Sequence, residues 1–387
     1  MENLMQKYVQ LLLVLLFVAC IAACGSSDAT TAPEAQIYET AITVTTLTGV
    51  AKTSGSSDYS TSADPPATFN RPTDITTTDG SVFFIADYAN NAIRKVTSAG
   101  EVSTLICTTD GTAPTTFNGP FSLTTDGTNI YVVDNSSHTI RFINISTNIV
   151  TTVGTAGSSG SVDVDVISPA TTADATVARF YSPTGIATDG TNLYVADSGN
   201  HTIRKINIST KEVSTLAGAA GTVGSTDSTD GTGTTARFNG PQRITTDGTN
   251  LYVTDFNNRT IRKIVISSGN TTTLAGVPGT VGSSGGIADS TDGTGVTARF
   301  NQPNGITTDG TNLYVTDSYM NTIRKIVIST GETTTVSGIA GTAGFVDTAD
   351  GTPSFDTPIG ITTTNGANLF VTDTNNHTIR KIAQSVD

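Results

Sequence analysis

Short apolar runs separated by polar turn residues follow one another along this chain, and the same pattern occurs six times. Each copy begins with Phe-x-x-Pro, continues through an apolar stretch to Asp-Gly or Asn-Gly, and then has an aromatic-containing run that ends in Asp. Such turns between apolar runs favour β-hairpins. In the third copy the pattern predicts strands at 186–189, 193–197, 202–208 and 212–216, so we expect four antiparallel strands per copy.

The Asp that ends the second strand is always followed by an Arg seven residues later. The pairs are Asp87/Arg94, Asp134/Arg141, Asp197/Arg204, Asp255/Arg262, Asp317/Arg324 and Asp373/Arg380. Successive Asp residues are 47 (Asp87 to Asp134) to 63 (Asp134 to Asp197) residues apart. A constant core with variable connections is typical of one structural unit repeated, with insertions confined to loops. Six four-stranded units predict an all-β fold, a six-bladed β-propeller.

The two ends of the repeated region complement each other. The last copy stops at Ile382 without a fourth strand, whereas a sequence similar to the fourth strand of the third copy, Val213–Gly218, occurs at Val44–Gly49. We expect this N-terminal strand to complete the last blade and close the ring, because closure removes free sheet edges. This assigns residues 41–387 to the propeller.

The N-terminus has the layout of a targeting segment. Lys7 precedes an apolar run from Val9 to Val18 that is short for a membrane-spanning helix, and small residues follow. The sequence Ala-Ala-Cys24-Gly resembles the lipobox of bacterial lipoproteins, which implies cleavage before Cys24 and lipidation of that residue. An ordinary secretory signal is the alternative. We therefore expect a signal peptide at 1–23 and a lipidated, flexible tether at 24–40.

This interpretation predicts an exported protein of the cell envelope, in the outer membrane if the organism is Gram-negative, whose only contact with the membrane is its lipid. Cys107 would then be the only thiol, which excludes an intrachain disulfide. The formal net charge of -13 argues against nucleic acid as a partner, because phosphate backbones repel a negatively charged protein. We also expect a monomer.

Two segments carry a family resemblance. Asn200–Arg204 and Asn376–Arg380, both Asn-His-Thr-Ile-Arg, resemble the signature of the NHL repeat, and so do the loops at Asp230–Phe238 and Asp292–Phe300. The resemblance extends over about 41–387 and implies a propeller. It leaves the activity open, because NHL propellers serve as binding platforms, as RNA readers and, in a few cases, as lyases or lactonase-like enzymes.

Residues that recur in every copy are interpreted as scaffold, since a functional site needs one asymmetric set of groups. We expect each Asp/Arg pair to form a charge-assisted hydrogen bond and each Phe of Phe-x-x-Pro to pack between blades. His138, His201 and His377 occupy one repeat position in different blades, too far apart to share a zinc ion. No cofactor is expected. Calcium is the alternative, because loops such as Asp227–Gly231 resemble calcium loops in part.

Positions at which the copies differ are the candidate ligand site. Where the pattern has Pro-x-Gly-Ile, blade one has Asp74, blade two Ser122 and blade four Arg243. Blades one and four are opposite in a six-bladed ring, so Asp74 and Arg243 should face each other across the channel. In turns of the same face, small polar residues are replaced by Tyr88, Phe256, Tyr319 and Met320, which fits a recognition patch. The candidate ligand-binding residues are Asp74, Phe121, Gln242, Arg243, Phe256, Asn304, Tyr319 and Met320.

The long inter-blade insertions should lie on the same face as these residues, and binding residues concentrate on loops over a rigid scaffold. No nucleophile elbow, Cys–His pair or phosphate loop occurs in a suitable context, so no catalytic residue is predicted. We therefore favour a binding or scaffold module for a protein, peptide or glycan. The alternative is a lactonase- or lyase-type enzyme with a metal in the central channel, for which Asp74, Asn304 and Gln242 are the candidate ligands.

Overall fold

The computed structural model describes residues 42–60, 65–109, 114–163, 178–228, 230–278, 290–348 and 352–384. They all belong to one compact unit, Thr40–Asp387. The predicted signal peptide, Cys24 and the tether lie outside the described residues. Within the ranges given, no helix is long and apolar enough to cross a membrane.

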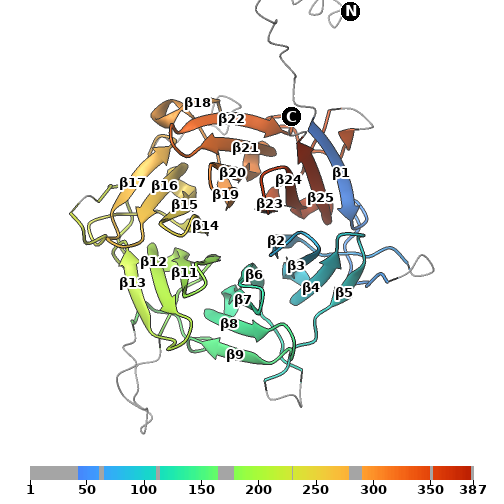
Figure 1. The fold of residues 1–387 in the computed structure, drawn as a ribbon, viewed down its shortest axis with the longest axis horizontal. Coiled ribbons are helices and arrows are strands. Elements are labelled where there is room, and N and C mark those ends of the chain that lie inside the picture. The colour runs from blue at the N-terminus through green and yellow to red at the C-terminus, as the bar shows by residue number, and fades with distance from the viewer. Residues whose placement is uncertain are drawn as a thin grey trace, which may run out of the picture. The chain divides into compact units, whose positions relative to one another are not determined.

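Six antiparallel sheets surround a central axis, and the strand that follows Phe-x-x-Pro is the innermost strand of each sheet (Figure 1). In blades one to three the strands are β2 (Pro72–Thr77), β3 (Val82–Asp87), β4 (Ala92–Thr97), β5 (Val102–Thr104); β6 (Pro120–Thr125), β7 (Asn129–Asp134), β8 (Thr139–Asn144), β9 (Val150–Val153); β10 (Gly185–Thr188), β11 (Asn192–Asp197), β12 (Thr202–Asn207), β13 (Val213–Ala217). In blades four to six they are β14 (Pro241–Thr246), β15 (Asn250–Asp255), β16 (Thr260–Val265), β17 (Thr271–Ala275); β19 (Pro303–Thr308), β20 (Asn312–Asp317), β21 (Thr322–Val327), β22 (Glu332–Ser337); β23 (Pro358–Thr363), β24 (Asn368–Asp373), β25 (Thr378–Gln384), β1 (Ile42–Thr48). A two-residue strand, β18 (Gly293–Thr294), adds to the outer edge of blade five. The predicted six-bladed propeller is confirmed.

The N-terminal strand completes the last blade, as the sequence predicted. β1 pairs antiparallel with β25, with Val44 opposite Ile382. Val44 is fully buried and belongs to the apolar cluster of blades five and six. The ring is therefore closed by hydrogen bonds between the two ends of the described chain. Because β1 covers it, the outer edge of β25 is paired.

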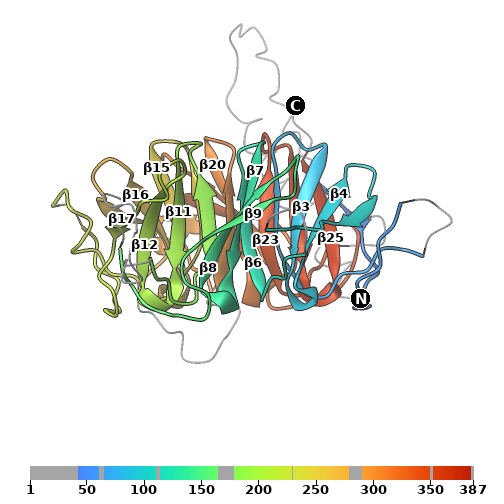
Figure 2. The same ribbon diagram turned by 90° about the horizontal axis from the view of Figure 1, so that it is seen from below.

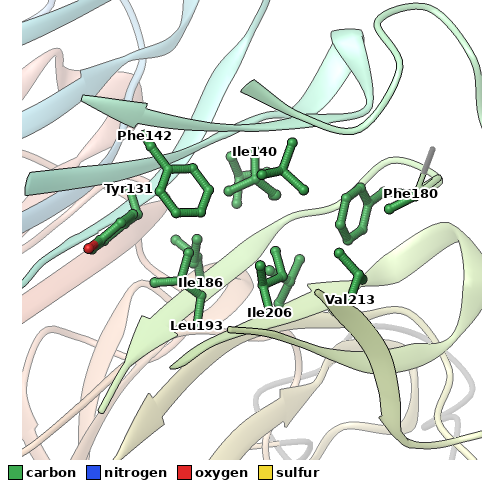
Figure 3. Packing of buried hydrophobic residues seen from close by; sticks show 12 residues of the cluster. Tyr131, Ile140, Phe142, Phe180, Ile186, Leu193, Ile206 and Val213 are labelled. Atoms are coloured by element: carbon green, nitrogen blue, oxygen red, sulfur yellow. The ribbon is translucent and has the colours of Figure 1, made fainter. Parts of the chain in front are cut away.

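The hydrophobic core lies between neighbouring blades. Figure 3 shows Tyr131 and Phe142 of blade two facing Ile186 and Leu193 of blade three, with Phe180 of the connecting loop in the same cluster. Phe180 comes from Phe-x-x-Pro and is fully buried, which confirms the expected packing of this residue between blades. Each such side chain contributes roughly 1.5–3 kcal/mol by its burial, so adjacent blades stabilise each other.

Connections of different kinds lie at the two ends of the strands (Figure 2). The long-loop face carries the inter-blade loops and the turns between second and third strands, and the turn face carries the other hairpin turns. On the long-loop face the hairpin turns are short 3₁₀ helices: η1 (Tyr88–Asn90), η2 (Asn135–Ser137), η3 (Ser198–Asn200), η4 (Phe256–Asn258), η7 (Ser318–Met320) and η9 (Thr374–Asn376). A further one, η6 (Gly295–Thr297), belongs to an inter-blade loop.

The repeated Asp and Arg form buried ion pairs inside each blade. In blade three, Arg204 Nη1 lies 2.8 Å from Asp197 Oδ2, and both side chains are fully buried. Arg204 Nη2 also donates to Asp163 of the preceding inter-blade loop, and its guanidinium lies over Phe180. Burial raises the pKa of Asp197 to about 6 although Arg204 and other donors lower it. The pairs are scaffold, as expected. In blades one, three, four, five and six the Arg also binds an Asp of the preceding inter-blade loop, whereas Arg141 of blade two binds Thr152 of β9.

The acidic loops that resemble calcium loops contribute to the same network. Asp227 accepts a hydrogen bond from Arg262 at 2.8 Å, and Asp292 accepts one from Arg324 at 2.9 Å. Asp347 does so from Arg380 at 2.6 Å. Each of these carboxylates is paired with the buried guanidinium of a repeated Arg by a charge-assisted hydrogen bond, which ties the loop to its blade.

The histidines join one blade to the next. His201 lies at the end of η3 in the left-handed conformation, with φ of 59°, and its Nδ1 accepts a hydrogen bond from the Gly240 backbone N–H at 3.1 Å. His138 and His377 accept equivalent bonds from Ser182 and Arg71. Each histidine therefore holds a separate junction between two blades.

Candidate functional site

The central channel is crossed by a single arginine. Arg243 of β14 is 3% exposed, and its Nη1 donates to the Thr184 carbonyl oxygen at 2.7 Å. Its Nη2 donates to the carbonyl oxygens of Thr73, at 3.0 Å, and Phe121, at 2.9 Å. The guanidinium also lies 4.3 Å from the centroid of the Phe121 ring. One side chain from blade four is thus bonded to the backbones of blades one, two and three.

The position of Arg243 is occupied by glycine in blades three, five and six because the innermost strands approach each other closely. At Gly305, for example, a Cβ would lie 2.0 Å from the Ile359 carbonyl oxygen. A side chain at Gly305 would therefore force the two strands apart, whereas blades one, two and four have Asp74, Ser122 and Arg243 at this position.

Asp74 meets Arg243 in the channel, as the opposite positions of their blades predicted. Its Oδ2 lies 3.8 Å from Arg243 Nε and accepts hydrogen bonds from Ser122 Oγ, at 2.6 Å, and the Leu123 N–H, at 3.0 Å. Burial raises the pKa of Asp74, while Arg243 and the hydrogen bonds lower it. The Nε atom of Arg243 is buried and has no hydrogen-bond partner among the described residues.

These two residues are not surface contacts. The sequence placed Asp74 and Arg243 in a ligand site near the channel mouth, but their side chains are buried. Arg243 donates to backbone carbonyl oxygens, and Asp74 accepts from Ser122 and from a backbone N–H. Asn304 is also buried, at 8% exposure. Phe121 and Gln242 remain partly exposed. The physical reason is the narrow channel, in which one guanidinium suffices to contact three blades.

A small polar cavity of about 140 Å³ lies on the turn-face side of Arg243. Its lining continues along the innermost strands toward the Asp-Gly turns and includes Thr76, Thr124, Thr307 and Thr362. Sites for drug-sized ligands are roughly 300–1,000 Å³, so this volume suits a few water molecules rather than such a ligand.

The channel residues do not fit a divalent metal, which the lactonase or lyase alternative requires. Metals of that kind need several carboxylate or imidazole ligands. In the part of the chain that the structure describes, no three His, Cys, Asp or Glu side chains are grouped to hold a metal ion. Asp74 is the one carboxylate among the residues that line the cavity, and the cationic Arg243 lies beside it.

Several turns of the long-loop face carry an aromatic side chain that is exposed or partly exposed. Tyr319 of η7 is 52% exposed, and Phe256 of η4 is partly exposed. Tyr88 of η1 is also partly exposed and contacts Phe121 edge-on, with 5.7 Å between ring centroids. Of the aromatic residues that the sequence selected for this face, the structure brings Tyr88 and Phe121 into contact.

Met320 is a correction to the predicted patch, because it is 1% exposed. It follows Tyr319 at the third position of η7, where Asn200 in blade three points inward and donates to the strand-end Asp. In blade five, the Ser290 hydroxyl instead donates to Asp317 at 2.8 Å and accepts from Arg324 at 2.7 Å. Met320 therefore fills an interior position.

Tyr181 belongs to the same face but was missed by sequence reasoning. It is 47% exposed and contacts His138 edge-on, with 5.9 Å between ring centroids. A signal was present in the repeat, because Tyr181 follows the Phe of Phe-x-x-Pro. The equivalent residues in the other copies are Asn70, Asn118, Asn239, Asn301 and Asp356.

Comparisons with known proteins agree with this architecture. The family model of the NHL repeat matches residues 180–206. Human NHL repeat-containing protein 2 is 26% identical over 288 residues, which are 68% of this chain and 39% of that protein. Protein SUPPRESSOR OF QUENCHING 1, chloroplastic, of Arabidopsis thaliana is 27% identical over 286 residues, 70% of this chain and 25% of that protein. The chain therefore spans less than half the length of these two relatives.

Solved structures share the fold at low sequence identity. An auxiliary nutrient binding protein from Bacteroides thetaiotaomicron has a TM-score of 0.63 and 16% identity over 92% of this chain and 79% of that chain. A streptogramin B lyase has a TM-score of 0.50 and 14% identity over 85% of this chain and 97% of that chain. With the six repeats and the ring of six blades, these findings show a β-propeller that contains an NHL repeat at residues 180–206 and resembles NHL repeat-containing proteins.

Proposed function

We propose that this propeller is an envelope-associated binding module that recognises a protein, peptide or glycan through its long-loop face. The observation that carries the proposal is the pair of exposed tyrosines, Tyr181 and Tyr319, at positions where the other repeats have small or polar residues. Tyrosines have large, rigid surfaces with a polar end, and they are enriched at the centres of binding interfaces.

The scaffold under these residues supports recognition because it holds the turns in place. In η7, the Ser318 hydroxyl donates to the Pro358 carbonyl oxygen of the next blade at 2.6 Å. In η2, Asn135 Nδ2 donates to the Pro183 carbonyl oxygen at 2.7 Å, beside Tyr181. A ligand that contacts this face would therefore require little ordering of the backbone, which favours affinity. The auxiliary nutrient binding protein from Bacteroides thetaiotaomicron is, by its name, also a binding protein, although its similarity to this chain concerns the fold alone.

Removal of the two tyrosines tests the proposal. Tyr181→Asn with Tyr319→Asn installs a residue that other repeats have at these positions, so the fold should persist. The matched control, Thr249→Asn with Thr311→Asn, places the same residues at exposed turns of the opposite face. Wild type and control should retain the same partner from envelope extracts or on a glycan array, and the tyrosine variant should lose it. Equal retention by all three proteins would contradict the proposed face.

The envelope location rests on the lipobox-like sequence at Cys24. Expression of the full chain in a bacterium with metabolic labelling by a clickable fatty acid tests it. Wild type should incorporate the label and sediment with membranes, whereas Cys24→Ala should remain unlabelled and soluble. Unchanged partitioning of the variant would refute the lipid anchor and leave the binding face to be tested separately.

A further inference from the structure

A larger cavity lies on the turn face between blades two and three. Its volume is about 360 Å³, within the range of roughly 300–1,000 Å³ typical of small-molecule sites. Blade two contributes Tyr131, Phe142 and Ile149, and blade three contributes Ile208 and Lys211. Asn129 and Asn144 add polar groups at the ends of β7 and β8.

Phe142 departs from the repeat at this cavity. The residue after the repeated Arg is lysine in the other five blades: Lys95, Lys205, Lys263, Lys325 and Lys381. Phe142 lies between Tyr131 and Thr151 in the register of the sheet, and it contacts the Tyr131 ring edge-on with 5.0 Å between centroids. Figure 3 shows the two rings side by side on blade two, facing blade three. Blade two thus presents an apolar wall where other blades have a cation.

Lys211 departs from the repeat at the same place. It lies in the turn between β12 and β13 with φ of 64°, a left-handed conformation that favours glycine and asparagine. The equivalent residues in other blades are Gly100, Asn148, Gly269 and Gly331. Lysine is therefore less favourable than glycine for the local backbone at this position.

The ammonium of Lys211 faces the cavity wall. Its Nζ lies 3.9 Å from the centroid of the Phe142 ring and donates to the Ile208 carbonyl oxygen. Among the described residues, no carboxylate forms an ion pair with it. An ammonium has three donors, so two remain for a ligand.

We propose that this cavity binds a small organic carboxylate with an apolar body. Lys211 supplies the countercharge, and the Phe142 ring and the Ile149 and Ile208 side chains contact the apolar body. A carboxylate is favoured over a neutral molecule because charge-assisted hydrogen bonds are about twice as strong as neutral ones. The site is separate from the tyrosines of the long-loop face and does not depend on the function proposed for them.

The repeat itself provides the variants for a test. Lys211→Gly removes the ammonium and installs the residue of blades one, four and five. Phe142→Lys removes the apolar wall and installs the residue of the other five blades. Because both substitutions restore repeat residues, the variants should fold. Lys205→Gln is the control, since it removes a charge from blade three at a residue that does not line the cavity.

Titration with phenylacetate, followed by ligand-observed NMR on the full propeller, measures binding, with phenylacetamide as the uncharged analogue. A ligand of this size should bind at about millimolar affinity. Affinity should fall by about tenfold or more in Lys211→Gly, because a bond to a charged group is lost. It should also fall in Phe142→Lys and remain unchanged in Lys205→Gln. The proposal is overturned if wild type does not bind phenylacetate, if it binds phenylacetamide equally well, or if Lys211→Gly binds as wild type does.

Discussion

Replacement of Arg243 by methionine tests how much this one cation contributes to the stability of the ring. Methionine keeps much of the aliphatic volume but removes three hydrogen bonds to carbonyl oxygens of blades one, two and three. It also leaves Asp74 buried without its countercharge. Removal of one partner of a buried pair typically costs about 3–5 kcal/mol, and we expect a loss of that size in the free energy of unfolding.

The loss can be converted to a melting temperature. The ring from Ile42 to Gln384 has about 340 residues, and unfolding entropy is about 2.1 cal/mol/K per residue, or roughly 0.7 kcal/mol/K in total. A loss of 3–5 kcal/mol therefore lowers the melting temperature by about 4–7 °C. Circular dichroism during heating and guanidinium titration measures both quantities, since the chain has no tryptophan for fluorescence.

A double-mutant cycle separates the ion pair from the other contacts of Arg243. Asp74→Asn removes the charge that Arg243→Met leaves unpaired, so the double variant should be more stable than the sum of the single effects predicts, by about 0.5–3 kcal/mol. Strict additivity, or an Arg243→Met variant within about 1 kcal/mol of wild type, would refute the account of the channel given above.

Three further predictions concern the scaffold. Deletion of β1 should lower the melting temperature of the whole ring, because β25 loses its outer partner; an unchanged value would refute the closure. Gly305→Ala should destabilise by several kcal/mol in denaturant titration, as its Cβ would collide with a carbonyl oxygen, and a neutral effect would show that β19 and β23 can separate. Tyr194→Phe removes the hydrogen bond from the phenol to Asp189. Burial raises the pKa of this Asp, but its hydrogen bonds outweigh burial and lower the pKa below the ordinary value. Such a carboxylate adds stability above about pH 4 that is lost in acid, so the cost of about 0.5–1.5 kcal/mol at pH 7 should shrink at pH 3; a constant cost would contradict this linkage.

The ring could be predicted from the sequence because its determinants are local and repeated. Each Asp and Arg pair is held at a constant spacing by one hairpin, so six copies reveal six blades. The partner of Arg204 in the loop, Asp163, could not be predicted, because the distance between the two residues depends on an insertion of variable length.

The candidate site could be predicted less well because side-chain direction depends on the turn. Tyr319 and Met320 are adjacent in sequence, yet one is exposed and the other buried, since the 3₁₀ helix turns its third residue inward. Arg243 was correctly expected to face Asp74. Arg243 is buried because the channel is narrow, and the width of the channel cannot be predicted from the sequence pattern.

The pairing of β1 with β25 has a consequence for the kinetics of folding. Val44 and Ile382 are paired in space but lie at opposite ends of the sequence that forms the ring. Their contact therefore has a far greater sequence separation than the contacts within a blade. Loop-closure entropy opposes such a pairing until the intervening blades are compact, and distant strand pairings are slow to form. We therefore expect the seam between β1 and β25 to form late in folding. Until it forms, β25 has an open edge at which a second copy of the chain could pair.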